Sequence, residues 1–198
     1  IGAIAARAAG ERAGPIAAAT AAVYPPLVWI PAYVFSESLF MPLALGSVML
    51  LDAARRRADA ERSPRGGSAL TIAAGLVAGT AILVRPGMLF FLPIAALWFV
   101  RQRRWSLAVA VCVAAMAVVA PWTLRNAKEY GRFVLVATEG GVTFWTGNHP
   151  LATGEGDLAA NPAIKQADVA FRQSHPGLTA AELEPLYYRE ALAHIARN

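Results

Sequence analysis

The feature that most constrains this chain is the confinement of its charges to short arginine-rich segments between long apolar runs. Apolar residues make up 57% of the 198 residues and charged residues only 16%, with a mean hydropathy of +0.44. A soluble domain has about 45–50% apolar and about 25% charged residues. The pattern therefore predicts an integral membrane protein. The net charge of +5 agrees with loops anchored in the cytoplasm better than with nucleic-acid binding, because the arginines directly flank apolar runs.

We expect residues 1–126 to form an all-α polytopic transmembrane helical bundle of about four to five spans. The apolar stretches cover residues 15–35, 38–51, 69–84, 88–100 and 105–124. The last stretch, at about 20 residues, is long enough to cross ~30 Å of hydrocarbon. The two stretches before it have about 13–16 residues each. This length is short for a full crossing, but it is tolerated if the turn at residues 85–87 lies in a water-filled recess.

The arginines predict the sidedness of these spans. Three segments carry them: residues 7–14, the charged loop 52–67, and residues 101–104. Arginine-rich loops favour the cytoplasm, so all three are placed there. The segment 24–37, Arg85 and everything after Leu124 then belong on the outer side. The expected location is the inner (plasma) membrane of a bacterium, with an extracytoplasmic tail.

Glu37 is a carboxylate between apolar residues, which is costly at membrane depth unless it faces water, a metal ion or a partner. The preceding prolines prevent a regular helix through residues 24–36. Two interpretations stay open. Ser36 can cap a helix that holds Glu37 in its first turn, where the helix dipole favours it, or Glu37 can face an outward cavity.

Arg85 and Arg125 are the basic counterparts of Glu37 on the predicted outer side. Arg85 stands at the turn formed with Pro86 and Gly87, and Arg125 follows the last span. Each side chain can extend to the lipid headgroups. Alternatively, each can bind phosphate through its planar guanidinium group. Their outer position runs against the usual charge bias and favours an anionic lipid ligand.

The tail, residues 127–198, has a different character, and we expect a small mixed α/β domain. Residues 133–137 and 142–146 have the composition of extended strands, with a turn between them. Residues 162–174 and 179–197 are predicted to be helices, and Thr179 with Glu182 fits a capping box.

Several kinds of site are missing from the sequence. It has no Walker-type phosphate loop, dinucleotide fingerprint, nucleophile elbow or paired-cysteine motif, so a nucleotide-dependent soluble enzyme is not expected. His149 and His175 have no second ligand at metal spacing, and no metal site is predicted. No cofactor is identified, and the sequence leaves open whether a divalent metal ion takes part.

Four motifs carry a resemblance to a known family. They are residues 24–26 (YPP) with 36–40 (SESLF), 84–87 (VRPG), 121–126 (PWTLRN) with 131–134 (GRFV), and 139–141 (EGG) with 144–150 (FWTGNHP). In this order and spacing they resemble bacterial GT-C glycosyltransferases, the group related to protein O-mannosyltransferases and aminoarabinose transferases. The resemblance covers nearly the whole chain.

The resemblance implies a GT-C-like membrane enzyme that uses a polyprenyl-phosphate-linked sugar as donor at the outer face of the membrane. The acceptor would be a lipid, a glycan or a protein. It also implies that Glu37 is catalytic and that Arg85 and Arg125 bind the donor phosphate. Tyr24, Trp145 and Asn148 are candidates for substrate contact, although packing or interface anchoring explains the first two better.

In such enzymes an essential acidic residue lies in the first outer loop, which would be upstream of Ile1. The chain begins without methionine and ends within a helical pattern. We therefore expect a fragment that is inactive alone. Two other functions remain open: a lipid or polysaccharide transporter that holds a headgroup in the same basic recess, and a non-catalytic assembly subunit.

Overall fold

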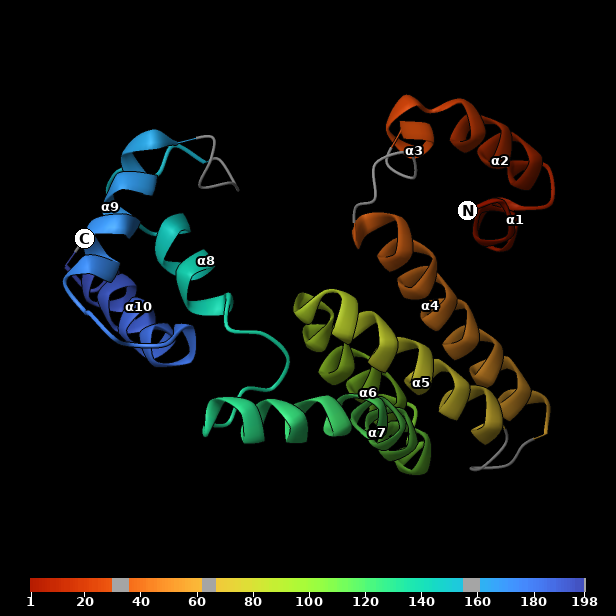
Figure 1. The fold of residues 1–198 in the computed structure, drawn as a ribbon. Helices are drawn as coiled ribbons and strands as arrows, with labels where there is room; N and C mark the ends of the chain where they lie inside the picture. Colours follow the sequence, from red (N-terminus) through yellow and green to blue (C-terminus); the bar gives the residue numbers. More distant parts are fainter. Residues whose placement is uncertain (30–35, 62–66, 155–160, 198) are drawn as a thin grey trace. The chain divides into compact units, whose positions relative to one another are not determined.

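The computed structural model of this chain describes residues 1–29, 36–61, 67–154 and 161–197. They form two compact units, residues 1–121 and 122–198. Every regular element in these described ranges is helical, which confirms the all-α fold class (Figure 1).

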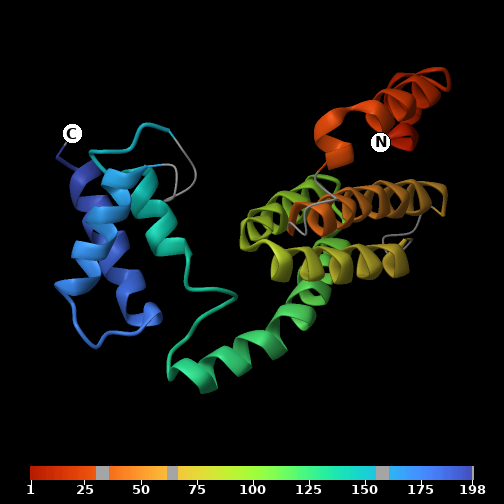
Figure 2. The ribbon, with the colours of Figure 1, turned by 45° about the horizontal axis from the view of Figure 1, so that its top comes forward.

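The first unit is a set of helices that return on one another. In chain order they are α1 (Gly2–Ala9), α2 (Ala13–Val23), α3 (Pro25–Trp29), α4 (Ser36–Ala60), α5 (Ser68–Val84), the 3₁₀ helix η2 (Pro86–Phe90), α6 (Phe91–Arg101) and the first part of α7 (Trp105–Tyr130). α4 and α5 lie side by side and run in opposite directions (Figures 1 and 2). The predicted turn at residues 85–87 is confirmed. Part of the first predicted apolar stretch, residues 30–35, lies outside the described residues.

Two helices of the described chain, α4 and α7, are long and apolar enough to cross a membrane by length and composition. The apolar helix Ala13–Val23, α5, and the η2–α6 segment are shorter. The two long helices favour a membrane location for the chain.

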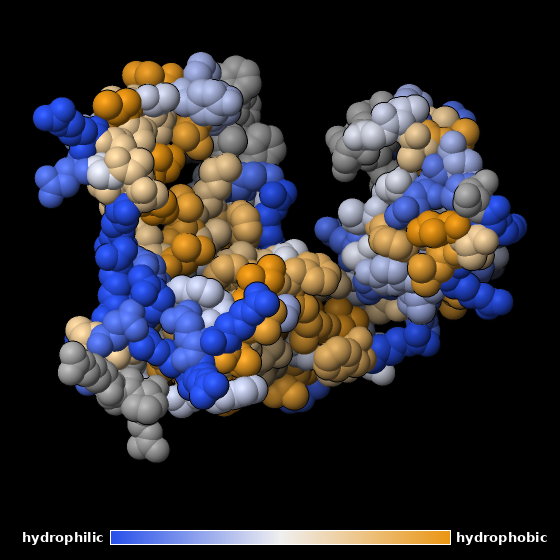
Figure 3. Space-filling view, turned by 180° about the vertical axis from the view of Figure 1, so that it is seen from behind, coloured by the Kyte–Doolittle hydropathy of each residue, from blue (hydrophilic) through white to orange (hydrophobic). Residues whose placement is uncertain are grey.

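The surface of the first unit carries large apolar side chains on α4, α5, α6 and α7. Those more than half exposed on α4, α6 and α7 are Leu39 (56%), Ile94 (66%), Leu97 (54%), Trp105 (65%), Val109 (60%) and Val113 (62%). Figure 3 shows apolar residues over much of this unit. A soluble monomer rarely exposes apolar residues so continuously, so this surface also favours contact with lipid.

The interior of the first unit is built from a few large side chains and many alanines. Phe99, Leu107 and Val111 are fully buried, together with Ala54 and Ala74. Small residues allow two helix backbones to approach closely. Close packing of helix backbones at these alanines therefore contributes much of the stability of this core.

Two glycines one turn apart mark a close approach between α5 and α7. A Cβ added at Gly75 would lie 2.6 Å from the Ala114 Cβ, and one at Gly79 would lie 2.6 Å from the Ala115 carbonyl oxygen. This is the small-xxx-small packing by which helices associate in membranes.

The predicted charged loop 52–67 is wrong in its first half, because α4 continues to Ala60. Three ion pairs at i, i+4 spacing stabilise this extension: Asp52 with Arg56, Arg55 with Asp59, and Arg57 with Glu61. Such pairs contribute about 0.3–0.5 kcal/mol each. The inner face of the same stretch buries Leu51, Ala54 and Ala58 at helical spacing. Arg62 and Arg65 of the predicted loop lie outside the described residues.

The second unit contains the end of α7 and three further helices. These are α8 (Gly140–Gly147), α9 (Pro162–Gln173) and α10 (Ala180–Ile195). α9 and α10 confirm the two helices predicted for the tail. The predicted capping box is also confirmed: the Thr179 backbone N–H donates to Glu182 Oε2 at 2.9 Å. This hydrogen bond is the main reason that the pKa of Glu182 is lowered.

The described residues of the tail do not show the predicted mixed α/β domain, because residues 142–146 lie within α8 and are helical. Gly140 and Gly141 begin this helix instead of forming a hairpin turn. A Cβ added at Gly141 would lie 2.5 Å from the Glu184 carbonyl oxygen of α10. The glycines therefore serve the close packing of α8 on α10, a tertiary effect that the strand-like composition of residues 142–146 does not reveal.

Residues 133–137 also form no strand. The side chains on one face of α7 bond to their carbonyl groups: Trp122 Nε1 donates to Val136 O at 2.9 Å, Thr123 Oγ1 to Leu135 O at 2.7 Å, and Asn126 Nδ2 to Val136 O at 3.0 Å. The segment keeps the alternation of an extended chain, with Val134 and Val136 buried and Phe133 exposed. A helix, and not a neighbouring strand, satisfies its backbone.

Candidate functional site

One end of the α4–α5 pair collects the arginines that the sequence places in the cytoplasm. Arg104 donates to Asp59 Oδ1 at 2.6 Å and to the Arg55 carbonyl at 3.1 Å. Arg7 lies 3.5 Å from Asp52. The described parts of three segments, far apart in the sequence, therefore share one end of the first unit, as a single membrane face requires.

The opposite end of the same helix pair holds Glu37 and Arg85. Arg85 Nη2 lies 2.7 Å from Glu37 Oε1. Since α4 begins at Ser36 and α5 ends at Val84, antiparallel packing brings the first turn of one helix to the end of the other. The structure thus pairs the predicted carboxylate with one of the two predicted phosphate-binding arginines.

Local sequence explains why Arg85 stands at this end. Pro86 disfavours the helical conformation in the residue before it, and Arg85 has φ −141° and ψ 108°. Its N–H still donates to the Ala81 carbonyl at 2.8 Å, so the side chain leaves from the last turn of α5. Glu37 lies in the first turn of α4, as the capping alternative predicts.

Both charges are favoured by the helices that carry them. A carboxylate is stabilised at a helix N-terminus and a guanidinium at a C-terminus. Ser36 Oγ donates to the second carboxylate oxygen, Glu37 Oε2, at 3.4 Å, and the Arg85 guanidinium lies 5.9 Å from the centroid of the Phe40 ring. The Glu37 and Arg85 side chains are 30% and 47% exposed. This is a partly open acid–cation pair that an anionic ligand can reach.

Arg125 belongs to the second unit. It is exposed on α7, with its guanidinium 5.0 Å from the Trp122 ring and Nη1 3.5 Å from Asn126 Oδ1. The residues that surround it, Trp122, Thr123 and Asn126, bind the 133–137 segment. In the sequence, this contact is indicated by side chains with hydrogen-bond donors at positions i, i+1 and i+4, which share one helix face.

We expect Asn126→Leu to loosen the segment after α7. Asn126 is 2% exposed and donates to both Val134 O and Val136 O. Val136 O keeps its bond from Trp122 Nε1, but Val134 O loses its side-chain donor. Leaving a buried carbonyl group without a donor costs about 1–3 kcal/mol. Hydrogen exchange of residues 131–139, measured by mass spectrometry, should become faster. Lys128→Ala, an exposed position on the same helix, is the matched control. Equal exchange in the two variants would contradict this assignment.

The three predicted substrate-contact residues differ in their access to solvent. Tyr24, at the end of α2, is 52% exposed. Asn148, at the end of α8, donates through Nδ2 to the Phe144 carbonyl at 2.8 Å. Trp145 is 4% exposed and packs against His149, Phe171 and Tyr187. Packing therefore accounts for Trp145, the alternative that the sequence left open.

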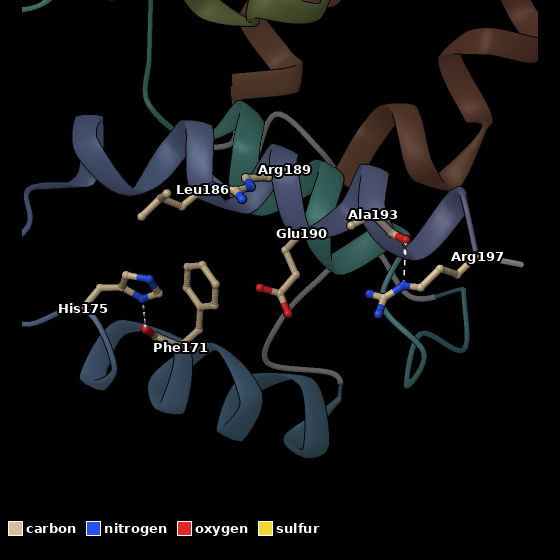
Figure 4. Close-up of a pocket in the computed structure, with 7 residues that line it drawn as sticks. All are labelled: Phe171, His175, Leu186, Arg189, Glu190, Ala193 and Arg197. Atoms are coloured by element: carbon tan, nitrogen blue, oxygen red, sulfur yellow. Dashed lines mark hydrogen bonds between the residues drawn. The ribbon is translucent and has the colours of Figure 1, made fainter.

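A cavity in the second unit was not expected from the sequence. It has a volume of about 360 Å³ and lies along α9 and α10 (Figure 4). Its lining residues are Phe171, His175, Leu186, Arg189, Glu190, Ala193 and Arg197. His175 Nδ1 lies 2.9 Å from the Phe171 carbonyl, and the two rings are 4.8 Å apart. The cavity has an aromatic wall and mixed charge, without an ionic preference that selects one ligand.

Neither a metal site nor a similarity to a known protein assigns a function to this chain. No group of three or more His, Cys, Asp or Glu side chains in the described parts of the chain is arranged to hold a metal ion. No family model matches the chain, and neither a curated protein nor a solved structure matches it. The pairing of Glu37 with Arg85 is therefore the observation on which a function can be based.

Proposed function

We propose that this chain is part of a multi-pass glycosyltransferase of the bacterial plasma membrane. It moves a sugar from a polyprenyl-phosphate-linked donor to a lipid, glycan or protein acceptor at the outer membrane face. The observation that carries the proposal is the 2.7 Å contact between Glu37 and Arg85. It joins an acid and a cation, the two groups that this reaction requires.

The chemistry assigns a role to each member of the pair. The acceptor oxygen forms a bond to the anomeric carbon of the sugar, while the bond from that carbon to the lipid phosphate breaks. Glu37 orients the acceptor hydroxyl and takes its proton. Arg85 stabilises the negative charge that develops on the departing polyprenyl phosphate. No nucleotide is needed, because the sugar arrives activated on the lipid.

The placement of charges supports this orientation in the membrane. The clusters around Arg55 and Arg104 lie at one end of the α4–α5 pair, joined through Asp59. Arginine-rich ends favour the cytoplasmic side. Glu37 and Arg85 lie at the other end of the pair, which supports an outer position for the acid–cation pair. The exposed apolar side chains between the two ends suit the lipid tails.

The test is transfer of labelled sugar from polyprenyl-phosphate donors by the full-length protein in membranes. We expect Arg85→Ala to lower the transfer rate about 100-fold or more, the usual effect of removing a group that stabilises developing negative charge. Arg56→Ala is the matched control. It removes an arginine that is ion-paired at the opposite end of α4 and should leave transfer unchanged.

Two results would contradict the proposal. One is an Arg85→Ala variant as active as the Arg56→Ala control. The other is a correctly inserted full-length protein that transfers sugar from none of the donors. In the second case, a lipid-translocation assay would decide whether the pair serves transport of the headgroup.

A further inference from the structure

We propose that the Glu37–Arg85 ion pair is a latch that the anionic headgroup of the donor opens. In this scheme a lipid phosphate binds Arg85 in place of the Glu37 carboxylate, and the freed carboxylate then becomes available to the acceptor hydroxyl. The inference rests on the proposed function and adds an order to it. The lipid phosphate must bind before Glu37 can act.

The first step concerns the carboxylate. Glu37 Oε1 lies 2.7 Å from Arg85 Nη2, and Glu37 Oε2 accepts from Ser36 Oγ at 3.4 Å. Both oxygens therefore have a partner in the structure. A general base must lie within hydrogen-bond reach of the proton that it removes. In the proposed scheme, Oε1 meets this condition when its contact with the guanidinium is exchanged for one with the acceptor.

The second step concerns the strength of the contact. The Arg85 side chain is 47% exposed and the Glu37 side chain 30% exposed. Ion pairs that remain partly hydrated contribute little net stability. The sugar-linked phosphate of the donor carries one negative charge, as the carboxylate does, and it can bind a guanidinium through two parallel hydrogen bonds. The donor headgroup is therefore a suitable competitor for the place of Glu37.

The third step concerns what keeps Arg85 in position during the exchange. Its guanidinium lies 5.9 Å from the centroid of the Phe40 ring. Phe40 is three residues after Glu37 on α4, so both side chains lie on one helix face. A ring attracts a cation through its face and leaves the N–H edge of the guanidinium for phosphate. Phe40 acts here as a positioning residue.

A purely structural role for the ion pair makes a different prediction. If Glu37 only fastens α4 to the end of α5, its removal should release Arg85 and weaken the binding of every ligand that Arg85 holds. If Glu37 competes with the ligand, its removal should strengthen that binding. The two roles therefore differ in the sign of one measured change.

The experiment measures the dissociation constant of a polyprenyl monophosphate for the full-length protein in detergent micelles, together with the turnover of the sugar-loaded donor. We expect Glu37→Gln to bind the lipid phosphate about 3- to 10-fold more tightly while turnover falls about 100-fold or more. Arg85→Ala should bind it weakly. The double variant should bind no more tightly than Arg85→Ala, because without Arg85 there is no guanidinium for which Glu37 and the lipid phosphate compete.

Two further variants keep the test decisive. Glu37→Ala should also bind more tightly, which covers the case in which the glutamine variant folds poorly. Phe40→Leu should weaken lipid-phosphate binding with less effect on the turnover of bound donor. If both Glu37 variants bind lipid phosphate as the unchanged protein does, or more weakly, the latch is wrong. If the unchanged protein turns the donor over in that same experiment, the proposed function survives. If it binds no lipid phosphate, both proposals fail.

Discussion

Gly79→Ala should destabilise the first unit, whereas the same substitution at Gly46 should be neutral or stabilising. Both glycines lie within helices, Gly46 in α4 and Gly79 in α5. In a helix interior alanine is preferred over glycine by about 0.5–1 kcal/mol. At Gly46 the added methyl group meets only Val77 Cγ1, at 3.9 Å. That position therefore gains the helix preference without a clash.

At Gly79 the same methyl group would lie 2.6 Å from the Ala115 carbonyl oxygen and 2.8 Å from Val118 Cβ. Neither atom is the flexible end of a side chain, so α5 and α7 must move apart. Overpacking of this kind costs about 1–3 kcal/mol, or more where backbone must shift. The helix preference is common to both variants, so the difference between them should be the overpacking cost, about 1–3 kcal/mol or more.

The measurement is the thermal unfolding midpoint of each variant in detergent micelles, with unfolding monitored by circular dichroism. Gly75→Ala, whose methyl group would lie 2.6 Å from the Val111 carbonyl oxygen, should behave as Gly79→Ala does. Unfolding midpoints that agree for the Gly46 and Gly79 variants would show that α5 and α7 do not pack as closely as described.

The helices that were predicted best from the sequence are those whose apolar composition alone indicates a helix. The breaks before Pro25 and Pro86 also followed from the sequence, since the residue before a proline disfavours the helical conformation. Pro25 and Pro86 themselves begin the next helices, α3 and η2. The charged end of α4 was predicted as a loop because arginine and aspartate look like a solvated connection. The i, i+4 spacing of the Arg55–Asp59 pair shows that they extend a helix instead.

The tail was predicted less well, for a tertiary reason. Residues 133–137 and 142–146 are rich in β-branched and aromatic residues, and strand propensity depends strongly on context. In the first segment the context is the Asn126 side chain, which takes the place of a neighbouring strand. In the second it is the close packing of Gly141 on Glu184. Neither contact can be derived from local composition.

For the candidate site, the sequence supplied the residues but not their pairing. Glu37 and Arg85 stood out because each is a charge within an apolar stretch. That they lie 2.7 Å apart depends on the antiparallel register of α4 and α5. A one-turn shift of that register would move the two charges about 5.4 Å relative to each other, so only the folded structure can bring them together.

Asp168→Ala should be the most destabilising single change in the second unit. Asp168 is 8% exposed and joins α9 to α10 by accepting from Tyr187 Oη at 2.5 Å. It also accepts from Arg172 Nε at 3.0 Å. Removing the carboxylate leaves the buried Tyr187 hydroxyl without its acceptor and releases Arg172. Loss of these charge-assisted bonds should cost about 2–3 kcal/mol.

Asp168→Asn is the matched control, since its amide oxygen can still accept from Tyr187. The bond to the partly exposed Arg172 is weakened, and a partly exposed ion pair contributes about 1 kcal/mol or less. Hydrogen exchange of α9 and α10 amides should accelerate about 30- to 150-fold in Asp168→Ala, the equivalent of 2–3 kcal/mol. The acceleration should be several-fold in Asp168→Asn. Equal exchange rates in the two variants would mean that the hydrogen bond to Tyr187 contributes nothing.

The same contact makes the second unit sensitive to alkaline pH. Burial raises the pKa of Tyr187, and the neighbouring Asp168 carboxylate raises it further. A tyrosine with a folded pKa above its unfolded value of about 10 stabilises the fold fully below pH 10 and loses this contribution as the pH rises. Protection of the α9 and α10 amides from hydrogen exchange should therefore decline above about pH 10. Tyr187→Phe should be less stable at neutral pH and should decline less steeply. Tyr188, whose pKa burial also raises, is present in both proteins, so it does not account for the difference. An alkaline decline as steep in Tyr187→Phe as in the unchanged protein would remove Tyr187 as its source.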